Sequence, residues 1–193
     1  LPRIPSGSVS KEEALARLAR KYLKAYGPAS VQDFAHWAGL RVNDSKAAFD
    51  TLSDSLEELT IRMQQGKVTI LKEDLSELLD IREPNPVHAR LLPAFDALIM
   101  GHKDKSRFVK KDAMSKVFLP LADVAATIML DGEVQGVWTI RKAKKIWKME
   151  LSPFKKFSEE ETESVEREVE RMKGFTGLDA ETIWKSFHHI TTA

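Results

Sequence analysis

The segment that decides the fold reads Leu59-Thr-Ile-Arg-Met63, Gln64-Gln-Gly-Lys67 and Val68-Thr-Ile-Leu71. Its first and last runs are rich in residues that favour β-strands, and the run between them contains a glycine. Two such runs around a glycine-containing turn predict an antiparallel β-hairpin. The two glutamines at positions 64 and 65 would then lie at the tip of this hairpin.

Three helices are expected ahead of the hairpin. Each begins at a residue whose side chain can accept hydrogen bonds from the first backbone N–H groups of a helix. These N-caps are Ser10, with Glu13 three residues on, Ser30, with Asp33 three residues on, and Asn43 or Asp44. Gly27-Pro28 and Gly39 end the first two helices. Helix, helix–turn–helix and hairpin in this order are typical of a winged helix, which we predict for residues 10–83.

The second half of the chain is richer in predicted strands. Lys72–Leu79 is expected to form a short helix, and Pro84 and Pro86 mark a boundary near residue 83. Strands are predicted at His88–Leu92, Val124–Leu130, Val134–Arg141 and Ile146–Leu151, with Asp131-Gly132 as a hairpin turn. A long acidic helix should run from Ser158 to Lys173 and end at Gly174. The predicted fold class is therefore α+β, a winged helix followed by a smaller β-rich domain over residues 84–193.

The distribution of charge is more informative than its total, because the chain carries a net charge of only +1. The predicted third helix, from Asn43 to Asp54, contains Lys46 but three aspartates. A groove-reading helix with this charge would be repelled by phosphates. We therefore expect the winged helix to act as scaffold, with base reading by the third helix as the alternative.

Positive charge concentrates in two later segments. Gly101–Lys116 has a net charge of +4 and Arg141–Lys156 has one of +6, and the second segment contains Trp147 and Phe154 and is followed by Phe157. Lysines and arginines gathered in this way can build a basic face that binds phosphates. The candidate DNA-binding residues are Lys103, Lys105, Arg107, Lys110, Lys111, Arg141, Lys142, Lys144 and Lys145. The alternative is that these lysines protect a strand edge from aggregation.

One carboxylate is a candidate for catalysis. Asp96 follows Leu91-Leu-Pro-Ala-Phe95 and should lie where a buried strand ends, which is a common location of functional side chains. Alternatively, its carboxylate accepts backbone N–H groups in a turn. Both interpretations stay open on the sequence alone.

The sequence predicts neither a metal nor a cofactor. There is no cysteine, and the five histidines are scattered except for His188-His189, whose side chains would point about 100° apart on a helix. No apolar run approaches the roughly 18 residues that a membrane helix needs. We therefore expect no membrane partner and a cytoplasmic location.

Three separated segments resemble a known family. They are Leu18–Ser30 continued by Asp33–Leu40, Leu91–Asp96 continued by Gly101–Ser106, and Leu130–Trp138. In this order they resemble the winged-helix DNA-binding family that includes bacterial DNA glycosylases of the AlkZ type, over about Lys11 to Gly174. The resemblance implies a C-shaped array of winged helices, a double-stranded DNA partner and removal of alkylated or cross-linked bases.

The chain departs from the family pattern at three places. Ala97-Leu98 stand where the family usually has Pro-Tyr, and Lys103-Asp104-Lys105 replace its Arg-Asp-Arg. Lysine keeps the charge of arginine but loses its bidentate fork. The family's catalytic Gln-x-Gln or Gln-x-Asp motif, carried by an N-terminal unit, is absent, because Gln32, Gln64-Gln65 and Gln135 do not have that spacing.

Three functional hypotheses follow. The first is a DNA-binding winged-helix protein that corresponds to the C-terminal part of a glycosylase-like architecture. We interpret the initial Leu1, in place of methionine, as the start of such a fragment. The second is a repair glycosylase that acts only when an N-terminal unit is present. The third is a protein-interaction or structural module that does not bind DNA.

Overall fold

A computed structural model describes residues 9–61, 66–80, 87–143 and 146–186 of the chain. The chain folds as two compact units. Unit 1 comprises Leu1–Arg82 and Ala97–Lys105, and unit 2 comprises Glu83–Asp96 and Ser106–Ala193. We describe each unit by itself.

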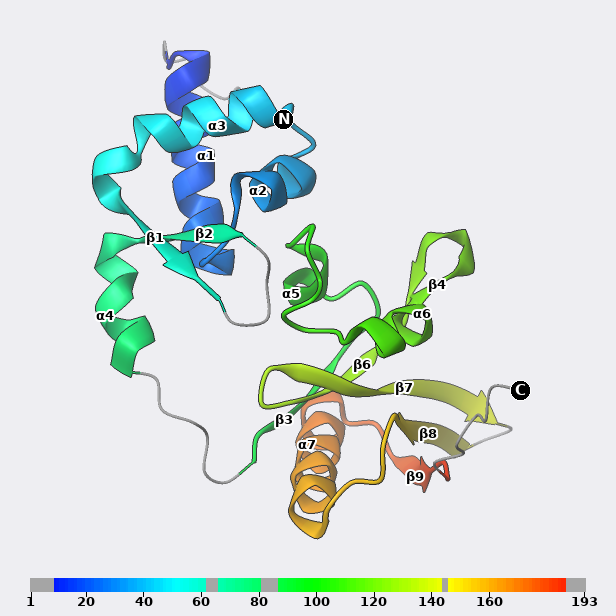
Figure 1. Cartoon of the computed structure of the whole chain (residues 1–193). Coiled ribbons are helices and arrows are strands. Elements are labelled where there is room, and N and C mark those ends of the chain that lie inside the picture. The colour runs from blue at the N-terminus through cyan, green and yellow to red at the C-terminus, as the bar shows by residue number, and fades with distance from the viewer. Residues whose placement is uncertain (1–8, 62–65, 81–86, 144–145, 187–193) are drawn as a thin grey trace. The chain divides into compact units, whose positions relative to one another are not determined.

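Unit 1 consists of helices and one antiparallel hairpin (Figure 1). Its elements are α1 (Lys11–Tyr26), α2 (Val31–Ala38), α3 (Val42–Thr51), η1 (Ser53–Ser55), β1 (Leu56–Thr60), β2 (Lys67–Leu71), α4 (Lys72–Asp80) and α5 (Ala97–Met100). Strand β1 pairs with β2 from Leu56 opposite Leu71 to Thr60 opposite Lys67. The predicted order of three helices, hairpin and short helix is therefore present.

The core of unit 1 is aromatic and lies where the first three helices meet the hairpin. Tyr22, Leu23, Phe34 and Leu71 are almost completely buried in it. The rings of Tyr22 and Phe34 lie 5.3 Å apart in a tilted arrangement. Buried aromatic side chains of this size dominate the hydrophobic stabilisation of a small unit, so these residues hold α1, α2 and β2 together.

Two local predictions in unit 1 need correction. Helix α3 begins at Val42 with Arg41 at the N-cap and without a side-chain cap, not at Asn43 or Asp44. The carbonyl of Arg41 already accepts the Ser45 N–H at 3.1 Å, which places Asp44 in the first helical turn. The first strand of the hairpin lies at Leu56–Thr60, three residues before its predicted start. Residues 64 and 65 are outside the described ranges.

Unit 2 is built on a five-stranded sheet in the order β3-β6-β7-β8-β9. The strands are β3 (Ala89–Leu92), β6 (Thr127–Leu130), β7 (Glu133–Ala143), β8 (Ile146–Pro153) and β9 (Ala180–Trp184). All neighbours are antiparallel except β8 and β9, which are parallel. A smaller segment contains η2 (Lys111–Ala113), α6 (Met114–Val117), β4 (Phe118–Leu119), η3 (Pro120–Ala122) and β5 (Asp123–Val124).

Helix α7 (Glu159–Thr176) packs against this sheet. Val165 and Val169 on its inner face join a core with Ile128, Met149 and Leu151. The predicted capping box is complete, because the Ser158 hydroxyl accepts the Glu161 N–H at 3.2 Å and the Glu161 carboxylate accepts the Ser158 N–H at 2.8 Å. The helix continues past Gly174, its predicted end, and stops at Gly177, which has the left-handed φ of 65° that favours glycine.

Helix α7 also covers the outer edge of strand β3. The backbone N–H groups of Val87, Ala89 and Leu91 donate to Glu160, Ser164 and Glu168, at 3.2, 3.0 and 3.5 Å. Four residues of helix advance about 6 Å and two residues of strand about 6.6 Å. The side chains therefore stay in register with every outward-facing N–H, and the helix substitutes for a neighbouring strand.

The segment Ala97–Lys105 belongs to unit 1, whereas our prediction placed all of residues 84–193 in one domain. The reason is a set of hydrogen bonds to α1 and α2. The Tyr22 hydroxyl donates to the Gly101 carbonyl at 2.8 Å. The Asp33 carboxylate accepts the N–H groups of Lys103 and Asp104 at 2.7 and 3.1 Å. The chain thus returns to unit 1 after forming β3.

Candidate nucleic-acid interface

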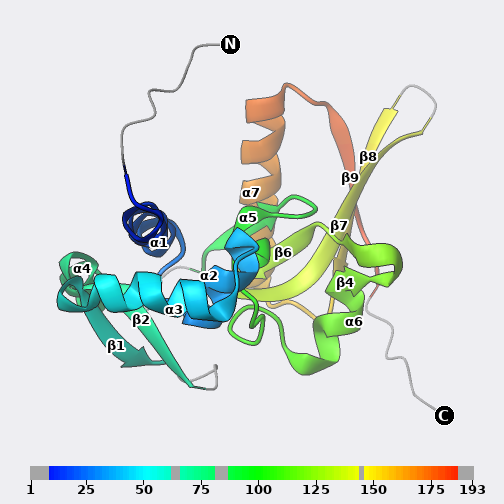
Figure 2. The ribbon, with the colours of Figure 1, turned by 90° about the horizontal axis from the view of Figure 1, so that it is seen from above.

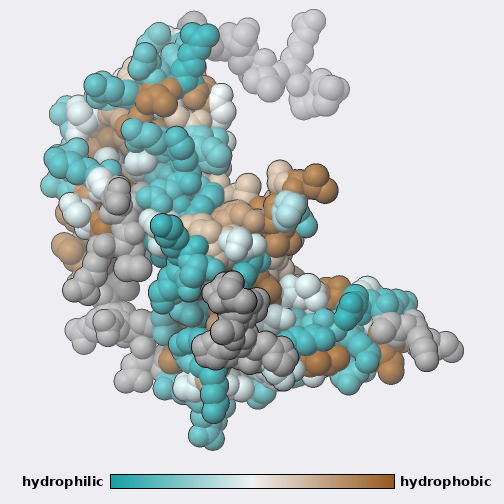
Figure 3. Space-filling view, turned by 45° about the vertical axis from the view of Figure 1, so that its right-hand side comes forward, coloured by the Kyte–Doolittle hydropathy of each residue, from teal (hydrophilic) through white to brown (hydrophobic). Residues whose placement is uncertain are grey.

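The first group of candidate cations lies on the β7–β8 hairpin of unit 2. Strand β6 pairs with β7 only as far as Val137, so the outer part of the hairpin is a three-stranded sheet of β7, β8 and β9. Arg141 lies opposite Lys148, and Lys142 lies opposite Trp147. In Figure 2 the outer part of β7 and β8 extends away from β6, with β9 alongside β8, and in Figure 3 hydrophilic residues gather over this part.

The two candidate cations of this hairpin that the structure describes, Arg141 and Lys142, are exposed. Arg141 is exposed and forms an ion pair with Glu150, which also lies 3.4 Å from Lys185. The hydrogen bond from Arg141 keeps the pKa of Glu150 below its ordinary value despite partial desolvation. The Lys142 ammonium lies 5.8 Å from the centre of the Trp147 ring, in a cation–π contact. Lys144 and Lys145 lie outside the described residues.

The second group of candidates surrounds η2 and α6 in unit 2. Lys111 is exposed at the start of η2. Lys110 pairs with Glu133 at 2.6 Å, and the Arg107 guanidinium lies 5.6 Å from the centre of the Phe108 ring. Lys116 is exposed and lies over the Phe154 ring at 4.9 Å. An exposed ion pair contributes about 1 kcal/mol or less, so Lys110 can exchange Glu133 for a phosphate.

The remaining two candidates belong to unit 1 and differ from each other. Lys103 is exposed, and its backbone is fixed by Asp33. The Lys105 ammonium is half-buried and donates to the carbonyls of Ile99, at 2.6 Å, and His102. Burial lowers the pKa of Lys105, and the nearby Asp33 charge opposes this shift. Lys105 therefore stabilises the segment that follows α5, and we no longer expect it to contact phosphate.

The candidate carboxylate Asp96 is half-buried and directly precedes α5. The residue before it, Phe95, has a left-handed φ of 56° and a side chain that is 52% exposed. A bulky residue at positive φ is a backbone outlier of the kind found at functional sites. No local pattern in the sequence indicates this strain, because phenylalanine after a strand predicts extended backbone.

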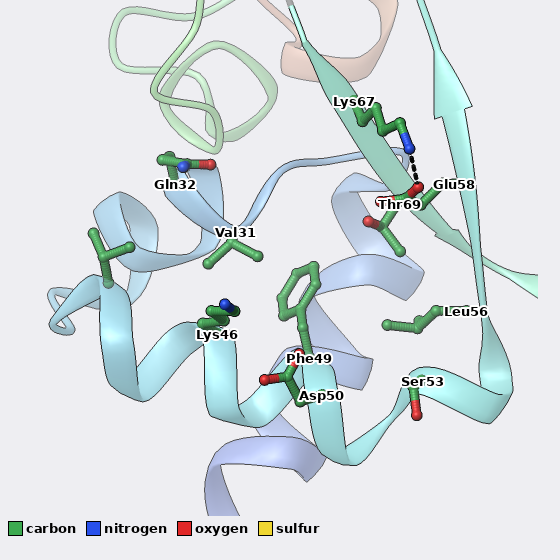
Figure 4. A pocket seen from close by; sticks show the side chains of 11 residues that line it. Val31, Gln32, Lys46, Phe49, Asp50, Ser53, Leu56, Glu58, Lys67 and Thr69 are labelled. Atoms are coloured by element: carbon green, nitrogen blue, oxygen red, sulfur yellow. Dashed lines mark hydrogen bonds and ion pairs between the residues drawn. The ribbon is translucent and has the colours of Figure 1, made fainter.

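Unit 1 also contains a cavity of about 430 Å³ between α2, α3 and the hairpin (Figure 4). Its charged lining residues are Lys46, Asp50, Glu58 and Lys67. Lys67 donates to Glu58 at 2.6 Å, the contact drawn as a dashed line in the figure. The lining charges balance, so this cavity offers no excess of positive charge to a phosphate. The scaffold role of α3 stays a prediction.

Among the described residues, no three His, Asp or Glu side chains lie close enough together to hold a metal ion. None of the helices in the described ranges is both long and apolar enough to cross a membrane.

Comparison with known proteins identifies the family. The family described as DNA glycosylase AlkZ-like matches residues 1–175. The chain belongs to this family. A curated member, the interstrand DNA cross-link repair glycosylase of Streptomyces sahachiroi, is 26% identical over 169 residues, which are 86% of this chain and 44% of that protein.

The fold agrees with that of a solved AlkZ-like protein. The structure of the Streptomyces sahachiroi DNA glycosylase AlkZ matches with a TM-score of 0.76 and 23% identity, over 93% of this chain and 48% of that one. The resemblance noted in the sequence is thus confirmed at the level of family and of mixed helix-and-sheet fold. The chain spans less than half the length of both AlkZ-like relatives.

Proposed function

We propose that this chain is a DNA-binding part of an AlkZ-like DNA glycosylase. In this proposal unit 1 is a winged helix that acts as scaffold. The observation that carries the proposal is the β7–β8 hairpin, where exposed Arg141 lies opposite Lys148 and exposed Lys142 lies opposite Trp147. Lysines and arginines on this hairpin can neutralise phosphates. The proposed contacts are Lys103, Arg107, Lys110, Lys111, Arg141, Lys142, Lys144 and Lys145, in a cytoplasmic protein.

A salt titration of binding to duplex DNA tests this proposal. Each phosphate contact contributes about 0.9 to the slope of log affinity against log salt concentration. The triple variant Lys142→Gln, Lys144→Gln, Lys145→Gln should therefore bind more weakly and lose up to about 2.7 from that slope. The measurement is fluorescence anisotropy of a labelled duplex at several salt concentrations.

The matched control removes three lysines from unit 1. Lys21, Lys46 and Lys72 are exposed on α1, α3 and α4, and their replacement by glutamine changes net charge by the same amount. This control should retain the slope of the unmodified chain. Equal losses in both variants would contradict the proposed contact face. Absence of measurable binding at low salt would instead favour a protein-interaction module.

The second candidate function is base excision by a longer chain. It is favoured by the family match together with the coverage of less than half of each relative. The sequence of this chain lacks the Gln-x-Gln or Gln-x-Asp spacing, so we expect no base release from alkylated duplex DNA by the 193 residues alone. Release of free base would be measured by chromatography. Release that disappears in Asp96→Asn would contradict this expectation and make Asp96 catalytic.

A further inference from the structure

The five-stranded sheet of unit 2 has one covered edge and one open edge. Helix α7 covers β3 at the first edge, whereas β9 (Ala180–Trp184) forms the other edge and pairs only with β8 among the described strands. Figure 1 shows β9 beyond β8 at the outer side of the sheet. The Lys185 N–H donates to the Leu151 carbonyl of β8 at 2.8 Å. Because backbone groups alternate in direction along a strand, the N–H and C=O groups of Thr182 and Trp184 point away from β8.

The open edge of β9 has little protection against strand pairing. Natural edge strands are usually protected by lysine, proline, a bulge or a covering segment. Strand β9 contains no lysine or proline, and its one charged residue, Glu181, is paired with Lys148 at 3.4 Å. The parallel register of β9 with β8 is regular from Ala180 to Trp184. Its outward-facing backbone groups are therefore available to an extended segment that forms a sixth strand.

A groove of about 470 Å³ lies beside this edge, between β9 and the C-terminal half of α7. Its apolar lining residues are Val169, Ala180 and Trp184, and the Trp184 ring lies edge-on to Phe157 at 6.0 Å. The Thr182 hydroxyl is buried in the same lining and has no hydrogen-bond partner among the described residues, which is uncommon. Side chains alternate along a strand, so a strand added to β9 would direct every second side chain towards this groove.

The charges around the groove favour a cationic occupant. Three carboxylates and one ammonium give its lining a net charge of −2; these are Glu166, Glu170, Glu181 and Lys173. Lys173 pairs with Glu170 at 2.9 Å, whereas Glu166 forms no ion pair with any described residue. Glu166 and Glu170 are four residues apart on α7, so their like charges repel each other. A second copy of the chain, paired through its own β9, would bring more carboxylates to this edge.

From these observations we propose that the open edge of β9 binds an extended basic segment of another protein by strand addition. In such a complex, backbone hydrogen bonds provide affinity and alternate side chains provide specificity. The partner's backbone would pair with Thr182 and Trp184. Lysine or arginine at every second position would pack its apolar stem against Val169 and Trp184 and bring its charge to Glu166. This interaction goes beyond DNA binding and does not depend on it.

The test measures binding of a short labelled peptide that alternates lysine and valine to the full 193-residue chain, by fluorescence anisotropy. The peptide should bind saturably, and a peptide with glutamate in place of lysine should not bind. A third peptide keeps the lysines but has methylated backbone amides, so it cannot donate hydrogen bonds to β9. Its affinity should be lower by about tenfold or more, because at least two backbone hydrogen bonds are lost.

A pair of double variants tests the place of the charge. Glu166→Gln, Glu170→Gln should weaken binding of the basic peptide by about fivefold or more, because ion pairs at the groove are lost. The matched control is Glu57→Gln, Glu77→Gln, which removes two exposed carboxylates from unit 1. The control changes net charge by the same amount and should retain the affinity of the unmodified chain.

Amide hydrogen exchange followed by NMR locates the peptide. Binding should slow exchange at the N–H groups of Thr182 and Trp184 and leave Ile183, whose N–H faces β8, nearly unchanged. Failure of the basic peptide to bind, equal binding of the methylated peptide, equal affinities of the two double variants or unchanged exchange at Thr182 and Trp184 would each overturn the proposal. A dimer of the peptide-free chain in light scattering would assign this edge to a second copy and overturn it as well.

Discussion

Replacing Asp33 by alanine is expected to destabilise unit 1 by about 3 kcal/mol or more, because buried N–H groups lose their acceptor at roughly 1–3 kcal/mol each. The Asp33 carboxylate is completely buried. It accepts the Ser30 N–H and hydroxyl at 2.9 and 2.7 Å, and the N–H groups of Lys103 and Asp104. One side chain thus caps α2 and holds the segment that returns from β3.

Chemical denaturation followed by circular dichroism measures this loss. The control is Asp50→Ala, because Asp50 is exposed on α3 and its removal should change the free energy of unfolding by less than about 0.5 kcal/mol. Similar stabilities for the two variants would show that Asp33 does not organise unit 1.

The same carboxylate should make stability depend on pH. Burial alone would raise the pKa of Asp33, but the hydrogen bonds from Ser30, Asp104 and Lys103 outweigh it and lower the pKa below the ordinary 3.8. The unfolded chain then binds this proton at higher pH than the folded one. The contribution is therefore complete well above pH 3.8 and is lost as pH falls through the lower folded pKa. The free energy of unfolding of the Asp33→Asn variant should therefore decrease less steeply as the pH is lowered.

Elements with local signals could be predicted from the sequence. The N-caps Ser10, Ser30 and Ser158 each bond to the backbone three residues on, so a short window contains the whole interaction. The Asp131-Gly132 turn is equally local, and both residues have the positive φ that such a turn requires. The third helix was predicted to begin too late, because Arg41 is extended but provides no side-chain cap.

Elements that depend on distant partners could not be predicted. Strand β9 pairs with β8 in parallel, although more than thirty residues separate the paired positions in the sequence. Parallel strands are not joined by a hairpin turn, so no turn signal predicts their pairing. The sequence predicts Asp33 as part of the N-cap of the second helix. Its other hydrogen bond, from the Lys103 N–H, comes from a residue 70 positions away and has no local signal. The same holds for charge: the basic segments were visible in the sequence, whereas the pairing of Lys110 with Glu133 and the burial of Lys105 depend on the tertiary fold.

Removing the hydrogen bonds that cover the edge of strand β3 should also cause a large loss of stability. The double variant Ser164→Ala, Glu168→Ala should destabilise unit 2 by about 3 kcal/mol, because the N–H groups of Ala89 and Leu91 lose their acceptors. The Ser164 hydroxyl also donates to the Val87 carbonyl at 2.7 Å. Because an uncovered strand edge pairs with other chains, the variant should also form soluble oligomers.

Denaturation gives the free energy of unfolding, and light scattering coupled to gel filtration gives the mass. Glu166→Ala, Glu170→Ala is the matched control, because both glutamates are exposed on α7 and neither bonds to β3 among the described contacts. Glu168 is buried, and although burial alone would raise its pKa, hydrogen bonding from Arg171 lowers it below the ordinary value. Its share of the loss should therefore shrink in acid, since the carboxylate is protonated there. A double variant as stable and as monomeric as the control would show that packing of α7, rather than its hydrogen bonds, protects this edge.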